Sequence, residues 1–326
     1  MREVIGRREF LALGVAAAPA VLGRWWWDAA RAGGAGGVAF VTADTEAHVA
    51  VVDLAARRVA SRIQTVADPR SIERAPAGRV ALVGHAGAGA ISLLDLDRRR
   101  VRRVLRGFAQ PRYTAFAPGG RVAYVSDSGA GEVAVVDVVA GRVVRRVGVG
   151  DGARHLGLSP DGATLWVALG SSAERVVVVD TRDARRPRRA GAIRLPFLGH
   201  DVAFSPSGRR VWVTASREGR VGVWSAGDRD LVRTLAADVG PQHVTFGPAT
   251  AYVASGEGRS VRTHALSDGH VLRRVRVPSG SYNIQRTGSR VITPSLGTGA
   301  LTLLDAHGRV TAQIPVARNA HDACLG

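Results

Sequence analysis

The segment Val133-Ala134-Val135-Val136-Asp137 decides the fold, because close copies of it recur along the chain. Successive copies lie 40 to 45 residues apart. Each copy is a short run of mostly β-branched or apolar residues, which is typical of a buried strand. The seven copies end at Asp53, Asp95, Asp137, Asp180, Ser225, Ala265 and Asp305. A motif repeated at this interval indicates a repeat architecture.

Three further strands are predicted around each copy. A segment such as Arg121–Ser126 precedes it, and an arginine-rich segment such as Arg142–Val149 follows it. The unit then ends in a strand that enters a Pro-Gly turn, as in His155–Gly162. Proline sets φ for such a turn and glycine permits positive φ. Seven four-stranded units predict an all-β fold, a seven-bladed β-propeller.

The two ends of the repeat region predict how the ring closes. The first unit opens at Val38–Thr42 without an innermost strand before it. The segment His321–Leu325 resembles His200–Phe204, which begins an inner strand. We therefore expect the C-terminal strand to join the N-terminal blade, with residues 33–326 forming a single propeller domain.

Several repeats resemble a known family. Ala251–Ser255, Leu165–Ala168 and Ser159-Pro160-Asp161-Gly162 look like the YVTN-type β-propeller repeat, and the resemblance covers nearly everything after residue 37. Val223-Trp224-Ser225 also resembles a WD40-like repeat, although that signature does not recur. The resemblance implies the fold and a frequently exported location. It implies no single activity, because propellers host many functions.

Residues 1–32 are predicted to be an export signal of the twin-arginine (Tat) type. Arg7-Arg8 precede Phe10-Leu11 and a short apolar run, and such signals are recognised by a receptor. We therefore expect export to the periplasm, the cell envelope or the medium. An uncleaved membrane anchor is the alternative, because Trp25–Trp27 follow the run and tryptophan favours membrane interfaces. We expect no other integral membrane segment.

The chain is strongly basic, and every basic residue is an arginine. Its formal net charge is +18. Many arginines fall on one strand of each unit, which we expect to be the outermost, where charge discourages edge-to-edge pairing. They could serve solubility alone or bind an anionic polymer. The only cysteine, Cys324, excludes an intramolecular disulfide and a thiolate cluster. We expect a monomer.

One register of polar residues is predicted to converge at the mouth of the central channel. Counting back from each turn finds a polar pair at the start of every inner strand. The pairs are Arg70-Ser71, Arg112-Tyr113, Arg154-His155, His200-Asp201, Gln242-His243, Ser281-Tyr282 and His321-Asp322. The predicted ligand-binding residues are Arg70, Arg112, Tyr113, Arg154, His155, His200, Asp201, Gln242, His243, Tyr282, His321 and Asp322. A concave polar site on a rigid scaffold is the usual place for a ligand.

The register leaves three interpretations open. The polar residues could simply meet solvent where the strands begin. They could form a non-enzymatic site for a small polar or anionic ligand or a partner protein, with arginine supplying charge. They could also hold a metal in a hydrolase or oxidoreductase through His155, His200, His243 and His321. No nucleophile elbow or paired-histidine motif assigns a catalytic residue or a cofactor.

Overall fold

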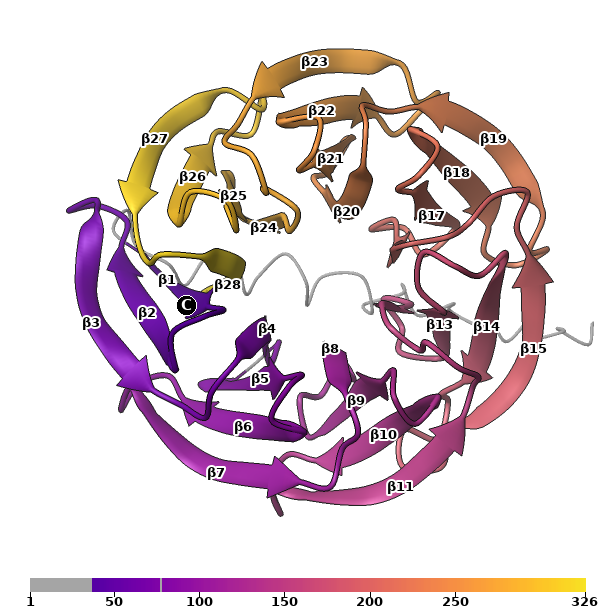
Figure 1. Ribbon diagram of the computed structural model, residues 1–326. Coiled ribbons are helices and arrows are strands. Elements are labelled where there is room, and N and C mark those ends of the chain that lie inside the picture. Colours follow the sequence, from indigo (N-terminus) through magenta and orange to yellow (C-terminus); the bar gives the residue numbers. More distant parts are fainter. Residues whose placement is uncertain (1–36, 77) are drawn as a thin grey trace, which may run out of the picture.

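The computed structural model describes residues 37–76 and 78–326. Within this part of the chain, seven four-stranded antiparallel sheets stand around a central axis (Figure 1). The predicted all-β seven-bladed propeller is confirmed. Arg7, Arg8 and the predicted signal lie outside the described residues. No helix in the described ranges has the length and apolar character needed to span a membrane.

The four strands of each blade run from the axis to the rim. The innermost strands are β4 (Pro69–Arg74), β8 (Pro111–Phe116), β12 (Leu156–Leu158), β16 (Val202–Phe204), β20 (Pro241–Phe246), β24 (Gln285–Thr287) and β28 (Ala320–Leu325). The second strands are β1 (Val38–Ala43), β5 (Val80–His85), β9 (Val122–Asp127), β13 (Thr164–Ala168), β17 (Arg210–Ala215), β21 (Thr250–Ser255) and β25 (Arg290–Pro294).

The remaining two strands of each blade complete the sheet. The third strands are β2 (His48–Asp53), β6 (Ala90–Asp95), β10 (Glu132–Asp137), β14 (Arg175–Asp180), β18 (Arg220–Ser225), β22 (Ser260–Ala265) and β26 (Ala300–Leu304). The outer strands are β3 (Arg58–Gln64), β7 (Arg100–Arg106), β11 (Arg142–Gly148), β15 (Arg188–Arg194), β19 (Leu231–Ala236), β23 (Val271–Arg276) and β27 (Val310–Pro315).

The last strand closes the ring. Blade 1 has the order β28-β1-β2-β3, whereas blades 2 to 7 follow chain order from β4 to β27. β28 pairs antiparallel with β1, so that Phe40 lies opposite Cys324. The lone thiol is buried there. Closure by the C-terminal strand is therefore observed as predicted, and it ties the two ends of the domain together.

The apolar core lies between neighbouring blades. The seven clusters of buried apolar residues found in the described chain each join the facing sheets of two adjacent blades. Trp166 of blade 4 and Trp224 of blade 5, for example, lie in one cluster and are almost inaccessible to solvent. Burial on both faces explains the almost uninterrupted valine and leucine runs of the third strands. The blades are consequently held at fixed positions around the axis.

The arginine-rich strands form the rim, as the sequence predicts. Arg100, Arg103 and Arg106 of β7 are exposed. In all seven blades, the pairing of the third strand with the outer strand contains a register shift. Charges and bulges both hinder the addition of another strand. The rim arginines thus have a structural role whatever else they bind.

Candidate metal centre

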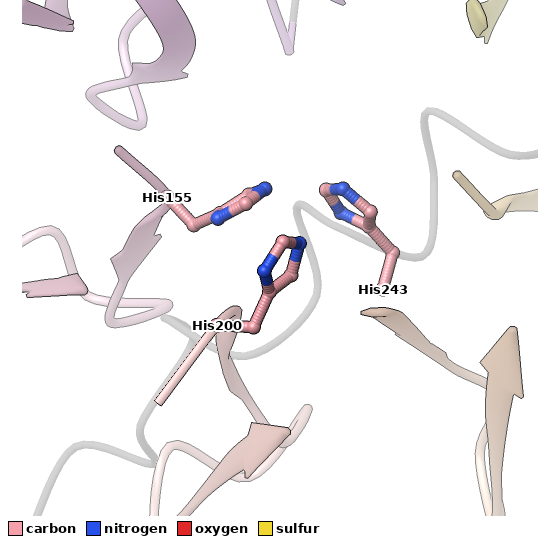
Figure 2. Close-up of side chains that lie close together, drawn as sticks. All are labelled: His155, His200 and His243. Atoms are coloured by element: carbon pink, nitrogen blue, oxygen red, sulfur yellow. The ribbon is translucent and has the colours of Figure 1, made fainter. Parts of the chain in front are cut away.

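Three histidines from consecutive blades meet near the central axis. His155 directly precedes β12 of blade 4, His200 lies two residues before β16 of blade 5, and His243 is in β20 of blade 6. Figure 2 shows the three rings directed toward one another. The repeat explains this convergence, because it brings the start of each inner strand to the same end of the axis.

The three imidazoles are close enough to share a ligand. One ring nitrogen from each histidine lies within 4.8 Å of the others. The ring centroids of His155 are 4.5 Å from those of His200 and 4.6 Å from those of His243. A tetrahedral Zn²⁺ with metal–nitrogen bonds of about 2.1 Å places its nitrogens roughly 3.4 Å apart. Small rotations of the side chains would bring these nitrogens to that spacing.

Neighbouring side chains occupy one nitrogen on two of the rings. Ser171 Oγ is hydrogen-bonded to His200 Nδ1. Asp201 Oδ2 lies 3.5 Å from His243 Nδ1. In both rings Nε2 is therefore the atom that would bind a ligand. It has no partner in His200, whereas in His243 it lies 3.2 Å from the Tyr113 hydroxyl. A carboxylate or hydroxyl behind a histidine is the usual outer partner of a metal-bound imidazole.

Unsatisfied nitrogen atoms mark the centre of the cluster. Within the described residues, His155 Nδ1, His155 Nε2 and His200 Nε2 are buried without a hydrogen-bond partner. Buried polar groups are rarely left unpaired, because each one loses its interactions with water. His155 is 1% exposed and still has no partner on either nitrogen. The lone pairs of these buried rings are therefore available to a ligand.

The histidines are held in the neutral form that a metal requires. Burial and the charge of Arg154 together lower the pKa of His200 to about 3. Burial and the neighbouring imidazoles also hold the pKa values of His155 and His243 well below their usual range. Each ring therefore keeps a lone pair at neutral pH, so no proton competes with a metal ion.

Tyr113 forms the fourth side of the cluster. Its ring lies 4.1 Å from the ring of His155, and its hydroxyl is 3.2 Å from His243 Nε2. Burial raises the pKa of Tyr113, so the phenol keeps its proton. The hydroxyl can donate to His243 when the site is empty, or to another acceptor when that nitrogen is engaged.

Three arginines lie beside the cluster, at the equivalent position of blades 2, 3 and 4. Arg70 Nη1 lies 3.4 Å from Asp44 Oδ2. Arg112 Nε donates to Ser128 Oγ over 3.0 Å. The Nε atom of Arg154 is buried without a hydrogen-bond partner. Burial lowers the pKa of Arg112 to about 10, and the charges of Arg154 and Arg70 contribute to this effect.

His321 lies outside the three-histidine group. Its Nδ1 is 3.4 Å from Asp44 Oδ1, and Arg70 faces the same carboxylate. Asp322, the next residue, accepts hydrogen bonds from the backbone amides of Ile72 and Ala323. Of the four predicted metal ligands, the structure therefore brings His155, His200 and His243 together and places His321 outside this group, beside the Asp44 carboxylate.

The other predicted site residues have mixed roles. The Gln242 side chain lies beside His200, where it opposes the lowering of that histidine's pKa. The ring of Tyr282 packs against Gly256, at a distance that a Cβ on the glycine would not allow. Asp201 accepts a hydrogen bond from the backbone amide of Val244, 3.2 Å away, and so links blade 5 to blade 6.

Several residues of the site escaped the prediction. Asp44, Ser128 and Ser171 come from the turn after the second strand, which faces the start of the inner strands. A polar residue at this turn in three blades is the signal that could have found them. Glu73 and Gln285 lie deeper along the axis, where the Gln285 side chain donates to Glu73 Oε2 over 3.1 Å. No local pattern distinguishes these two.

Comparisons with known proteins identify the fold and nothing finer. No family model matches the chain, and neither does any curated protein. Among solved structures, hydrazine synthase from Kuenenia stuttgartiensis is similar with a TM-score of 0.72 and 18% identity, over 82% of this chain and 91% of that one.

Two other solved structures share the architecture. Dihydro-heme d1 dehydrogenase NirN, solved in complex with DHE, gives a TM-score of 0.65 at 15% identity, over 88% of this chain and 75% of that one. The β-propeller domain of Cps50 (Swd1) from Myceliophteria thermophila gives a TM-score of 0.64 at 16% identity, over 76% of this chain and 86% of that one. At these identities the likeness supports the propeller fold, so any function must be argued from the site.

Proposed function

We propose that this protein is a metal-binding β-propeller, in which His155, His200 and His243 hold one divalent transition-metal ion near the axis. The observation that carries the proposal is the meeting of three neutral imidazoles whose facing nitrogens lie within 4.8 Å. The buried nitrogens without partners support it, because a metal would satisfy one nitrogen of His155 and Nε2 of His200.

The donor set favours particular metals. Imidazole nitrogen suits Zn²⁺, Cu²⁺, Ni²⁺ and Co²⁺, whereas Ca²⁺ and Mg²⁺ prefer oxygen. Three protein ligands leave a fourth position for water or another molecule, which is typical of catalytic rather than structural zinc sites. The proposal is confined to binding, and a hydrolase or oxidoreductase activity would need a substrate at that fourth position.

Metal titration of the full chain tests this proposal. The protein is first treated with a chelator to remove bound metal. Calorimetry should then show binding of Zn²⁺ or Co²⁺ with a stoichiometry near one. Replacement of a ligand should cost more than the roughly 10–100-fold in affinity typical of an outer partner. We expect such a loss for His155→Gln and an unchanged affinity for His270→Gln, whose exposed ring contacts Asp268. Binding that survives His155→Gln, or no saturable binding at all, would refute the proposal.

The N-terminal segment extends the proposal to location. We propose that the chain is exported by the Tat route, on the basis of Arg7-Arg8 and the apolar run that follows. Its repeats also suggest a place among YVTN-type propellers. Export should fail in a variant with both arginines replaced by lysine, measured by cell fractionation, whereas normal export of that variant would exclude this route.

The rim arginines give a separate prediction. Binding of an anionic polymer through them should weaken steeply as salt rises, because phosphate-type contacts release counterions. Strand-edge protection accounts for the same residues without any partner. Retention on a polyanion column that does not depend on ionic strength would exclude polymer binding. A monomeric state, and a protein partner at the propeller face, likewise stay predictions.

A further inference from the structure

The positive charge beside the three histidines lacks a matching negative charge. Arg154 precedes His155 in the chain, and its side chain forms no ion pair with a carboxylate of the described residues. Its Cδ lies 4.0 Å from where a Cβ on Gly170 would stand, and the next residue, Ser171, is hydrogen-bonded to His200 Nδ1. Arg112, one blade away, is hydrogen-bonded to the neutral hydroxyl of Ser128.

The carboxylates around the site are committed to other groups. Asp68, whose charge acts on Arg112, accepts from the backbone amide of Gly87. Asp201 accepts from the backbone amide of Val244 and faces His243. Asp322 accepts from two backbone amides. In the described ranges, none of the three forms an ion pair with Arg112 or Arg154. A divalent ion held by neutral imidazoles would therefore add two charges to a site that is already positive.

Physical chemistry requires a counter-charge for such a site. A buried or half-buried cation is strongly unfavourable unless an anion compensates it. Three protein ligands leave one coordination position for that anion. The guanidinium group presents N–H donors in a fork that fits the paired oxygens of a carboxylate or a phosphate.

Tyr113 supplies a second, independent indication. Its hydroxyl lies 3.2 Å from His243 Nε2, the nitrogen assigned to the metal. When that nitrogen binds the metal, its lone pair can no longer accept the phenolic hydrogen. The phenolic hydrogen would then need another acceptor close to the three histidines.

We propose that the site binds a metal and a small anion together, with one oxygen of a carboxylate or oxyanion on the metal and another paired with Arg154. Arg112 and Tyr113 contribute further donors to the same anion. This inference rests on the proposed metal site and names the class of molecule that occupies its open position.

Cobalt provides the test, because the visible absorption of Co²⁺ depends on its ligands. The full-length protein is loaded with Co²⁺ and titrated separately with acetate and with inorganic phosphate. Sodium perchlorate, a weakly coordinating salt, keeps the ionic strength constant. We expect a saturable spectral change with at least one of the two anions, and the tighter one shows whether the site prefers a carboxylate or a phosphate.

Two variants isolate the arginine. Arg154→Gln should weaken the anion about tenfold or more, as expected when a charge-assisted hydrogen bond is lost. It should also bind Co²⁺ more tightly, because a repelling charge is gone. Arg145→Gln makes the same charge change on the exposed rim strand β11 and should alter neither. If Arg154→Gln does not fold, Arg112→Gln takes its place with a weakened anion expected.

The outcomes distinguish failure of the anion site from failure of the metal site. A cobalt spectrum that neither anion changes, or an arginine variant that binds both anions as the parent protein does, overturns the anion site and leaves the metal site standing. Failure to bind Co²⁺ at all overturns the metal proposal itself. An equal loss in Arg145→Gln would overturn a local role for Arg154, since only the net charge would matter.

Discussion

Blades 5 and 1 carry the same dipeptide at the same place in the repeat, and the molecule uses it differently. His200-Asp201 begins the inner strand of blade 5, and His321-Asp322 begins that of blade 1. Both aspartates accept a hydrogen bond from the backbone of the next blade, from Val244 in one case and Ile72 in the other. The aspartates thus have one shared role, which is to fasten neighbouring blades.

The histidines of the two dipeptides differ in their neighbours. The turn facing His200 supplies Ser171, and the adjoining blades supply His155 and His243. The turn facing His321 supplies Asp44, which also contacts Arg70. His200 therefore lies with two other imidazoles, whereas His321 lies 3.4 Å from a carboxylate oxygen. Residues outside the dipeptide decide which of the two histidines joins the cluster.

Replacing each histidine of this comparison should give the largest contrast. His200→Gln should lower Zn²⁺ affinity by more than about 100-fold, because it removes a direct ligand. His321→Gln changes the equivalent residue and should leave the affinity within about threefold of the parent value, since His321 is not one of the three histidines whose ring nitrogens meet. Calorimetry on the two variants decides the matter, and similar losses in both would show that the two dipeptides are not distinct.

The shared role of the aspartates can be measured in urea unfolding. Asp322→Ala leaves two backbone amides without their acceptor and should cost about 2–3 kcal/mol. Asp322→Asn keeps only one acceptor oxygen and turns an NH2 donor toward the other backbone amide, so it should cost nearly as much. A matching loss in Asp201→Ala would extend the role to blade 5. If Asp322→Ala unfolds at the same urea concentration as the parent protein, the fastening role is wrong.

Ser171 tests whether the facing turn sets the behaviour of His200. Ser171→Ala removes the hydrogen bond to Nδ1 and should weaken Zn²⁺ about tenfold, at the lower end for an outer partner. The free energy of unfolding without metal should change little. Ser216→Ala, which alters the hydroxyl that donates to Ser171 over 3.2 Å, should have a smaller effect. An unchanged affinity in Ser171→Ala would remove Ser171 from the site.

The smallest effect is expected at Glu73, an acidic side chain on the inner strand of blade 2. Burial raises the pKa of Glu73 to about 8, with a further contribution from Asp322. The folded protein thus keeps a proton that the unfolded chain releases near pH 4.5, the usual pKa of a glutamate. Stability from this group is full below pH 4.5 and falls as pH rises toward 8.

Glu73→Gln removes that dependence and keeps a partner for Gln285. Its melting temperature should match that of the parent protein near pH 5 and exceed it by a few degrees at pH 8 to 9. Thermal unfolding at several pH values provides the measurement. A difference that is constant across this range would show that the pKa of Glu73 is not raised in the folded state.

Most of the architecture was predictable from one sequence. The copies of Val133–Asp137 at near-constant spacing predicted seven blades, and the likeness of the last segment to His200–Phe204 predicted closure through β28. The arginine-rich strands were correctly expected at the rim. These predictions succeed because each blade buries both faces of its central strands, and this burial requires a local pattern of apolar residues that every repeat shows.

The site was predictable only as a set of positions. The register of polar pairs contains all three clustered histidines, but it also contains His321 and Tyr282, which have other roles. Asp44 contacts His321 and Ser171 contacts His200, and both lie in turns that the register did not include. Side-chain direction and pairing depend on neighbours from other blades, and those contacts have no local signature.

The repeat by itself determined the ring, the order of its strands and the end of the axis where histidines gather, because spacing and hydrophobic pattern are local properties that every copy reinforces. Tertiary structure alone decided which three imidazoles share a centre and that His321 lies outside it, beside Asp44. That choice depends on distances of a few ångströms between side chains from different blades. The dipeptide His-Asp is identical in blades 5 and 1, so the sequence of the motif cannot reveal it.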